Sequence, residues 1–465
     1  MAKITFLGAT GTVTGSKFLL DVDNFRCMVD CGLFQGLKAL RLRNWEDFPV
    51  DPASIDCIII THAHIDHTGY LPRMVRKGFT GPIITTTSTA DLCGIMLPDS
   101  AHLQEEDAKY ANHKKFSKHD PALPLYTVED AHRTLEFLEP MPYGKTRQLT
   151  DKLALTFRDA GHILGSAFVD LRISKDGKET RVLFSGDLGR PAQPILRDPH
   201  TVFGTDYLIL ESTYGDRLHG KENIHAELAR VIRDSVERGG VLVIPSFAVG
   251  RTQELLYTIR ELEEAEQIPQ LPIYMDSPMA ISTTSVFSKN QQDHDLESKV
   301  IELDGRDILR TAQLQFVKSP QQSKSLNQIK RRAIIISASG MVTGGRILHH
   351  LFHRLPNPKT TVLFIGYQAQ GTRGRKILEG SGTVKIHGQH VPINAHIENI
   401  GGFSAHADYN EILAWLSSFN EAPKKVFLVH GEPEPIESLR QKITGHFGWP
   451  VEVPEYLSEF ELDCG

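Results

Sequence analysis

Short apolar runs separated by turn residues dominate the first 205 positions of the chain. Such runs occupy residues 3–7, 16–22 and 26–30, and the turn-rich stretch GATGTVTGS lies between the first two. Closely spaced short strands of this kind predict an antiparallel meander that forms one layer of a sandwich. Residues 88–118 are polar and predict a helix.

The pattern changes at about residue 206. The stretch GGVLVIPSFAVGRTQELLYTIREL predicts a buried strand, a loop and an amphipathic helix, and RRAIIISASGMVTGGRILHHLF repeats that order. Buried strands without polar alternation, joined by helices, are typical of a parallel, doubly wound sheet. We therefore predict one α/β domain interrupted by another, with a first part at 1–205, an inserted domain at 206–382 and a return segment at 383–465.

Composition narrows the class of protein. The 465 residues include 40% apolar and 23% charged residues, as in an ordinary soluble protein. No apolar run approaches the roughly 18 residues that span a bilayer, and the N-terminus resembles a first strand rather than a signal peptide. The net charge of −6 argues weakly against a general polyanion binder, although local positive charge decides such binding.

Five cysteines show no disulfide pattern, which predicts a reducing cytoplasm. Cys27 and Cys31 could form a redox pair, but buried core thiols are the commoner outcome. Nothing in the sequence sets the oligomeric state, and a homodimer is left open.

The strongest chemical signal is the stretch THAHIDHTG, which directly follows the buried run Cys57 to Ile60. It places four ligand-type side chains within six residues: His62, His64, Asp66 and His67. Imidazole and carboxylate together suit Zn²⁺ or a similar divalent metal. On a strand-end loop the set can divide between two ions, with the first pair on one ion and the second pair on the other. The alternative is a polar loop that is merely rich in histidine.

Further ligand-type residues follow other predicted strands. They are Asp30, His162, Asp187, Glu211, His406, Asp408 and His430. Each alone would be a weak signal, but strand ends at one edge of a sheet converge in space. His162 can supply a third ligand for one ion, and Asp187 a carboxylate that bridges both.

These motifs, in this order, resemble the metallo-β-lactamase superfamily and, within it, the beta-CASP branch of nucleic-acid-processing nucleases. The superfamily elements match at Asp30, HAHIDH, AGHILGSA and SGDLGR, and the branch elements at LESTYGD, GFSAHAD and LVHGEP. GFSAHADY is most similar to the endonuclease subunit of the messenger-RNA 3′-end cleavage machinery and its prokaryotic relatives. Members of that branch that act on RNA carry histidine at the position of His430, so the resemblance favours RNA over DNA as the substrate.

The resemblance implies an αββα metallo-β-lactamase sandwich with an inserted beta-CASP domain, acting as a zinc-dependent ribonuclease. It assigns His62, His64 and His162 to one Zn²⁺, Asp66, His67 and His430 to a second, and Asp187 to both; Mn²⁺ or Fe²⁺ suits similar ligands. Two such ions about 3.5–4 Å apart activate water and neutralise the phosphoryl group. An endonuclease is favoured, and a 5′–3′ exonuclease is left open.

The resemblance also suggests roles for three further side chains. Asp30 would orient a ligand histidine or the nucleophile, unless it is only a turn residue. His406 would be the general acid, held protonated and aligned by Glu211. Alternatively, His406 is a structural or helix-capping histidine, and Glu211 forms only a surface salt bridge.

Single-stranded RNA is the expected partner, and no membrane is expected. The turn SASGMVTGGR, with Ser339 and Gly340, could offer backbone N–H groups to phosphate, or its glycines could serve tight packing. Arg373, with the basic run 330–332, could contact the RNA backbone, although such charges are more often a solvated face. Competing functions are a thioester or lactone hydrolase, a non-catalytic RNA-binding scaffold and a DNA nuclease.

Overall fold

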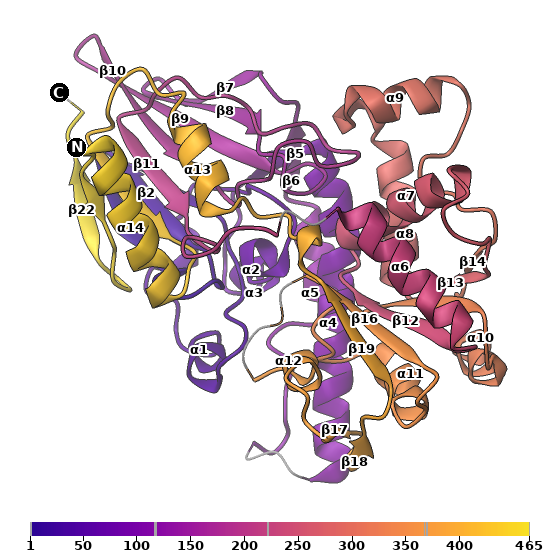
Figure 1. The fold of residues 1–465 in the computed structure, drawn as a ribbon. Helices are drawn as coiled ribbons and strands as arrows, with labels where there is room; N and C mark the ends of the chain where they lie inside the picture. Colours follow the sequence, from indigo (N-terminus) through magenta and orange to yellow (C-terminus); the bar gives the residue numbers. More distant parts are fainter. Residues whose placement is uncertain (1, 116–118, 221–222, 367, 369–370, 465) are drawn as a thin grey trace. The chain divides into compact units, whose positions relative to one another are not determined.

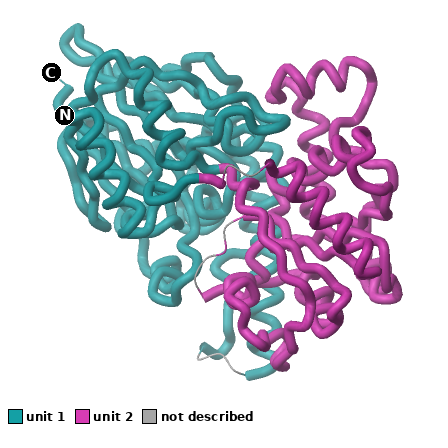
Figure 2. The backbone as a smooth tube through the Cα atoms, in the orientation of Figure 1, with its two compact units in different colours: residues 1–218, 406–465 teal, residues 219–405 magenta. Residues whose placement is uncertain are grey.

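The computed structural model describes residues 2–115, 119–220, 223–366, 368 and 371–464. The chain forms two compact units (Figure 2). Unit 1 comprises Met1–Leu218 and His406–Gly465, and unit 2 comprises His219–Ala405. The chain thus leaves unit 1 once and returns to it once.

Unit 1 contains two seven-stranded sheets (Figure 1). The first sheet has the order β22 (Glu459–Leu462), β1 (Ala2–Phe6), β2 (Phe18–Val22), β3 (Phe25–Val29), β4 (Cys57–Ile59), β5 (Ile83–Thr86) and β6 (Leu138–Met141). Strands β1 to β3 form the predicted antiparallel meander, whereas β3 to β6 are parallel. The parallel strands therefore all end at the same edge.

The second sheet of unit 1 combines both parts of the chain. Its order is β21 (Val451–Glu452), β20 (Lys425–Val429), β11 (Tyr207–Glu211), β10 (Lys178–Phe184), β9 (Ala167–Lys175), β8 (Leu153–Asp159) and β7 (Thr146–Thr150). Strands β10, β11 and β20 are parallel, and Glu211 lies opposite Val429 in the register. The loops after these three strands consequently emerge side by side.

Helices cover the outer faces of the two sheets. The inner faces pack against each other through a large hydrophobic core that includes Phe6, Phe157 and Phe184. On the second sheet, Leu208 and Leu428 pack with Ile412 and Leu439 of two covering helices, α13 (Tyr409–Leu416) and α14 (Pro433–Phe447). The other helices of unit 1 are α1 (Lys38–Arg43), α2 (Ile65–Thr68), α3 (Leu71–Arg76), α4 (Thr87–Lys114) and α5 (Val128–Leu135). Because α4 contacts β5 and β6 on the first sheet, the layers are αββα, which confirms the predicted sandwich.

Unit 2 is a parallel, doubly wound α/β domain, as predicted. Its sheet has the order β14 (Leu314–Phe316), β13 (Ile273–Met275), β15 (Ala333–Ala338), β12 (Val241–Ser246), β16 (Thr361–Ile365) and β19 (His396–Ile400), with all pairs parallel. One face packs on α6 (Ile224–Glu237), α7 (Arg251–Glu264) and α8 (Pro278–Lys289), and the other on α11 (Ile347–Arg354) and α12 (Arg373–Leu378). The remaining elements are α9 (Leu296–Leu303), α10 (Pro320–Ser325) and the hairpin β17 (Thr383–Ile386) with β18 (Gln389–Pro392).

The junctions between the units differ from the predicted ones at 205/206 and 382/383. Strand β11 pairs with β10 and β20, so it lies in unit 1. Strand β19 pairs with β16, so it lies in unit 2. An isolated buried strand does not reveal which sheet it joins, because its partners are distant in sequence.

Among the described residues, no helix is long and apolar enough to cross a membrane. All five cysteines are free and buried, and Cys27 lies opposite Cys57 on neighbouring strands.

Candidate metal centre

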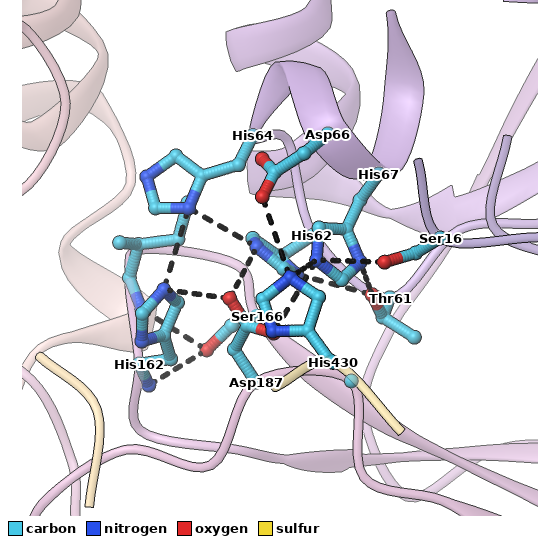
Figure 3. Close-up of polar contacts among 12 residues, drawn as sticks. Ser16, Thr61, His62, His64, Asp66, His67, His162, Ser166, Asp187 and His430 are labelled. Carbon is cyan, nitrogen blue, oxygen red and sulfur yellow. Dashed lines mark hydrogen bonds and ion pairs between the residues drawn. The ribbon is translucent and has the colours of Figure 1, made fainter. Parts of the chain in front are cut away.

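The ligand-type side chains of unit 1 converge at the carboxyl ends of its strands (Figure 3). His62 and His64 follow β4, and α2 carries Asp66 and His67 in the next turn. The loops after β8, β10 and β20 bring in His162, Asp187 and His430. Strands β10, β11 and β20 are parallel neighbours, and β8 runs in the same direction as β10 because the antiparallel strand β9 lies between them, so the three loops leave the second sheet at one edge.

One group of four side chains offers ligand atoms that all lie within 4.8 Å of one another: His62, His64, His162 and Asp187. His64 Nδ1 is 3.1 Å from His62 Nε2 and 3.3 Å from His162 Nε2. Asp187 Oδ2 is 3.4 Å from the same two Nε2 atoms. Three imidazoles and one carboxylate therefore face a common point.

A second group consists of Asp66, His67 and His430. His430 Nε2 lies 3.3 Å from His67 Nε2 and 3.4 Å from Asp66 Oδ2. The other carboxylate oxygen of Asp187, Oδ1, is 3.3 Å from His67 Nε2 and 3.4 Å from His430 Nδ1. Asp187 therefore lies between the two groups and turns one oxygen to each.

Burial keeps most of this cluster in the protonation state that metal ligands require. It lowers the pKa of His62 to about 3 and that of His64 to about 4, so both imidazoles are neutral at physiological pH. Burial alone would raise the pKa of Asp187, but the surrounding histidines hold it well below its ordinary value. Metals bind neutral imidazole and ionised carboxylate.

His67 behaves differently because it faces two carboxylates. Burial lowers its pKa, but Asp187 and Asp30 outweigh that effect and raise the pKa well above the ordinary value. Asp30 Oδ2 is 2.7 Å from His67 Nδ1, which leaves Nε2 facing the cluster. A carboxylate behind a ligand histidine fixes its tautomer and increases its basicity.

Three hydroxyl side chains that the sequence analysis did not single out contact the histidines of the cluster. Thr61 Oγ1 is 3.0 Å from His62 Nδ1 and 2.9 Å from Asp30 Oδ2, and its backbone N–H donates to Asp30 Oδ1 at 2.8 Å. Thr213 Oγ1 is 3.1 Å from His430 Nδ1, and Ser16 Oγ is 3.4 Å from His67 Nε2. Each has a positional signal in the sequence, because Thr61 directly precedes HAHIDH, Thr213 lies in LESTYGD and Ser16 ends GATGTVTGS.

A histidine–glutamate pair lies at the edge of the cluster. His406 Nδ1 is 3.0 Å and 3.2 Å from the two carboxylate oxygens of Glu211, which is fully buried. Glu211 also accepts hydrogen bonds from the backbone N–H groups of Leu188 and Thr213. The His406 ring packs 4.6 Å from that of His162, so its Nε2, on the far side of the ring from Nδ1, can serve the same site.

Asp408, another of the ligand-type residues in the sequence, caps a helix instead. Its side chain accepts hydrogen bonds from the backbone N–H groups of Asn410 and Glu411 at the start of α13. This capping box fixes the segment that carries His406.

The cluster fits a bound divalent metal. Asp187 Oδ1 is buried, makes no hydrogen bond among the described residues and has only the longer contacts with His67 and His430 at 3.3 and 3.4 Å, so a bound cation would satisfy it better than these contacts do. Imidazole nitrogen and carboxylate oxygen together suit Zn²⁺, Mn²⁺ or Fe²⁺. Both groups of ligand atoms can therefore hold a metal ion.

The predicted substrate-binding residues lie in unit 2. Ser339 Oγ is 2.8 Å from Thr343 Oγ1 within the loop that follows β15. A Cβ on Gly340 would lie 2.6 Å from the ring of Phe247, so packing alone requires glycine there. The guanidinium of Arg373 donates to the backbone carbonyls of Val342, Thr343 and Lys385, and so holds this loop against β17.

An αββα sandwich with paired histidine and aspartate groups at its strand ends defines a metal-dependent hydrolase. Family models match the metallo-beta-lactamase superfamily over residues 11–238, the Beta-Casp domain over 252–377 and the Zn-dependent metallo-hydrolase RNA specificity domain over 390–454. The chain belongs to the beta-CASP branch of the metallo-β-lactamase superfamily.

Individual relatives cover almost the whole chain. It is 36% identical to Ribonuclease TTHA0252 of Thermus thermophilus over 94% of this chain and 95% of the relative. It is 30% identical to Transcription termination factor FttA of Thermococcus kodakarensis over 99% of this chain and 71% of that protein. A crystal structure of a protein of unknown function from Enterococcus faecalis matches with a TM-score of 0.55 and 11% identity, covering 99% of this chain and 100% of that one. The last match concerns the fold alone.

Proposed function

We propose that this protein is a metal-dependent ribonuclease that hydrolyses phosphodiester bonds in single-stranded RNA. One observation carries the proposal: the His406–Glu211 pair lies beside two ligand groups that share Asp187. The 36% identical relative named as a ribonuclease supports the choice of RNA. A thioester or lactone hydrolase would use the same ligands but has no need for the His406–Glu211 pair.

The ligand groups suggest a two-metal site, most simply two Zn²⁺ with Mn²⁺ as an alternative. His62, His64 and His162 would hold one ion, Asp66, His67 and His430 the other, and Asp187 both. When bound, two such ions lower the pKa of an attacking water and neutralise charge on the phosphoryl oxygens.

The protein side chains then have separate tasks. Asp30 and Thr61 fix the orientation of His67 and His62 through the hydrogen bonds that they make behind the rings. As the bond from phosphorus to the leaving ribose oxygen breaks, His406 delivers a proton to that oxygen from Nε2. Glu211 holds the opposite side of the His406 ring and favours its protonated form.

Unit 2 would contribute to substrate binding. The loop from Ser339 to Gly345 exposes Thr343 and Gly345 and contains three glycines, and Arg373 supports that loop through its carbonyl contacts. If Arg373 also contacts RNA, Arg373→Ala should flatten the dependence of RNA affinity on salt. An unchanged slope would leave Arg373 with its role in positioning the loop.

The domain organisation that we propose is a catalytic sandwich interrupted by this substrate-binding domain. The five free thiols support a cytoplasmic location.

The proposal is tested by incubating the purified protein with single-stranded RNA, single-stranded DNA and a thioester, each with and without chelator. We expect cleavage of RNA that chelator abolishes and that added Zn²⁺ or Mn²⁺ restores. Asp187→Ala should lose both metal, measured by plasma mass spectrometry, and activity, whereas the exposed Asp151→Ala serves as a matched control. Full activity in Asp187→Ala would refute the proposal. RNA labelled at either end, with the 5′ phosphate present or absent, distinguishes internal from 5′-end cleavage.

A further inference from the structure

An exposed stretch of unit 1, residues 35–47, carries large apolar and basic side chains together. We define it as the α1 segment, because α1 lies at its centre and none of that helix's six residues is buried. Leu37, Leu42 and Trp45 are 66%, 52% and 50% exposed. Single exposed apolar residues are ordinary, but three within nine positions mark an interaction surface.

The residues that lead into the α1 segment, 31–33, form hydrogen bonds with residues 65–67, which belong to the loop that carries the ligand-type side chains. Cys31 N–H donates to the carbonyl of His67 at 2.7 Å, and Leu33 N–H donates to that of Ile65 at 3.0 Å. Gly32 packs so tightly that a Cβ there would lie 1.5 Å from the Asp66 carbonyl oxygen. The α1 segment therefore begins immediately beside the proposed catalytic centre, within the same compact unit.

The base of the α1 segment is rigid although its outer part is exposed. Asn44 is buried, and its side-chain amide both donates to the Phe34 carbonyl and accepts from the Phe34 N–H, at 2.8 and 3.0 Å. The guanidinium of Arg43 lies 4.3 Å from the ring centroid of Tyr456 and 5.5 Å from that of Phe34. These contacts hold the α1 segment in one position without covering its outer face.

Spacing along α1 brings charge and aromatic surface to one side. Lys38, Arg41 and Trp45 recur at intervals of three and four residues, and Asn44 keeps helical backbone angles, so the three side chains share a face. Glu46 and Asp47 follow, and Asp47 Oδ1 is 3.8 Å from the Lys77 ammonium, which reduces the negative charge at this end.

We propose that the α1 segment binds single-stranded RNA beside the catalytic centre, with a base stacked on Trp45 and phosphates against Lys38 and Arg41. This inference rests on the proposed ribonuclease function and adds a substrate contact on unit 1. Aromatic faces with neighbouring cations are the recurring surface for unpaired nucleic acid, because every base can stack and every linkage is anionic. The α1 segment would therefore bind nucleotides that lie outside the bond that is cut.

The test compares wild type with Arg41→Ala/Trp45→Ala on single-stranded RNAs of increasing length. Stacking and one phosphate contact predict a rise in KM of about tenfold or more for a long RNA. The rise should shrink as the RNA is shortened towards a dinucleotide, because a shorter RNA has fewer nucleotides to occupy both the catalytic centre and the α1 segment. The dependence of log(kcat/KM) on log salt should also become shallower by about 0.7, the contribution of one phosphate contact on a single strand.

Two residues of unit 1 outside the α1 segment supply the matched control. Lys145→Ala/Phe203→Ala removes an exposed cation and an aromatic side chain that is 64% exposed. It should leave KM, its length dependence and the salt slope as in wild type.

The outcomes separate this inference from the proposed function. If wild type cleaves long RNA and Arg41→Ala/Trp45→Ala matches it in KM and salt slope, the α1 segment does not bind RNA and the inference fails alone. If wild type cleaves no RNA, the proposed function fails, and the inference with it. If the double variant keeps wild-type RNA kinetics but loses co-sedimentation with phosphatidylserine vesicles, the surface is a membrane contact and the inference is overturned.

Discussion

Replacing His406 with asparagine tests the proton donor of the proposed reaction. Asparagine retains a hydrogen-bonding side chain of similar reach but cannot deliver a proton. In the structure, His406 Nδ1 is bound to Glu211 at 3.0 Å and lies 3.9 Å from Asp187 Oδ2, farther than the other histidines that face this carboxylate. The replacement should therefore leave both ligand groups in place.

The expected loss follows from the role of a general acid. A positioned proton donor accelerates a reaction by about 10²- to 10⁴-fold, equivalent to roughly 3–5.5 kcal/mol of transition-state stabilisation. The kcat/KM for RNA should fall by that full factor, because an unprotonated ribose oxygen is a poor leaving group. A phosphodiester with a p-nitrophenolate leaving group should lose far less, because that group departs without a proton.

The assay measures kcat/KM on a defined RNA and on bis(p-nitrophenyl) phosphate, with metal content determined by plasma mass spectrometry. His446→Asn, at an exposed histidine near the end of α14, is the matched control. Equal losses on both substrates would remove His406 from proton transfer. Loss of metal from His406→Asn would make it a ligand and refute the reasoning.

Three further predictions concern the interior of unit 1. Thr61→Val removes the hydroxyl that contacts Asp30 and should weaken metal binding by about 10- to 100-fold, measured by competition with a chelating dye. Asp170→Ala leaves Arg181 without its buried carboxylate partner at 2.8 Å and should lower the free energy of unfolding by about 3–5 kcal/mol, measured in urea. Burial lowers the pKa of Lys17 from 10.5 to about 8, so the unfolded chain binds more protons between these values and stability rises with pH there. Relative to Lys17→Met, wild type should gain about 3 kcal/mol over that window; a constant difference would contradict the burial effect.

Much of the catalytic unit could be predicted from the sequence because its chemistry follows short, strongly apolar strands. The run Cys57 to Ile60 is entirely buried, and the loop after it holds His62 and His64, as expected for ligands at a strand end. Coincident strand ends then bring Asp187 and His430 to the same point. Position along the chain and local hydrophobicity were sufficient for that step.

The remaining features depend on pairings that no local pattern records. Thr213 reaches His430 only because β11 lies beside β20, more than two hundred residues later in the chain. The same pairing places β11 in unit 1 rather than in the inserted domain. Arg373 resembled a free cation in sequence, but its guanidinium donates to backbone carbonyls on neighbouring elements. Basic residues reveal their charge in a sequence but not their hydrogen-bond partners.

The pairing of β1 with β22, in which Ala2 lies opposite Leu462, has a consequence for synthesis. A ribosome makes the first strand long before the strand that completes its sheet, and His406 and His430 also emerge late. A growing polypeptide, or one cut short by a damaged message, would therefore lack side chains that the proposed catalytic centre needs. On the proposed mechanism, such a fragment would cut no RNA during translation, when its own messenger lies closest.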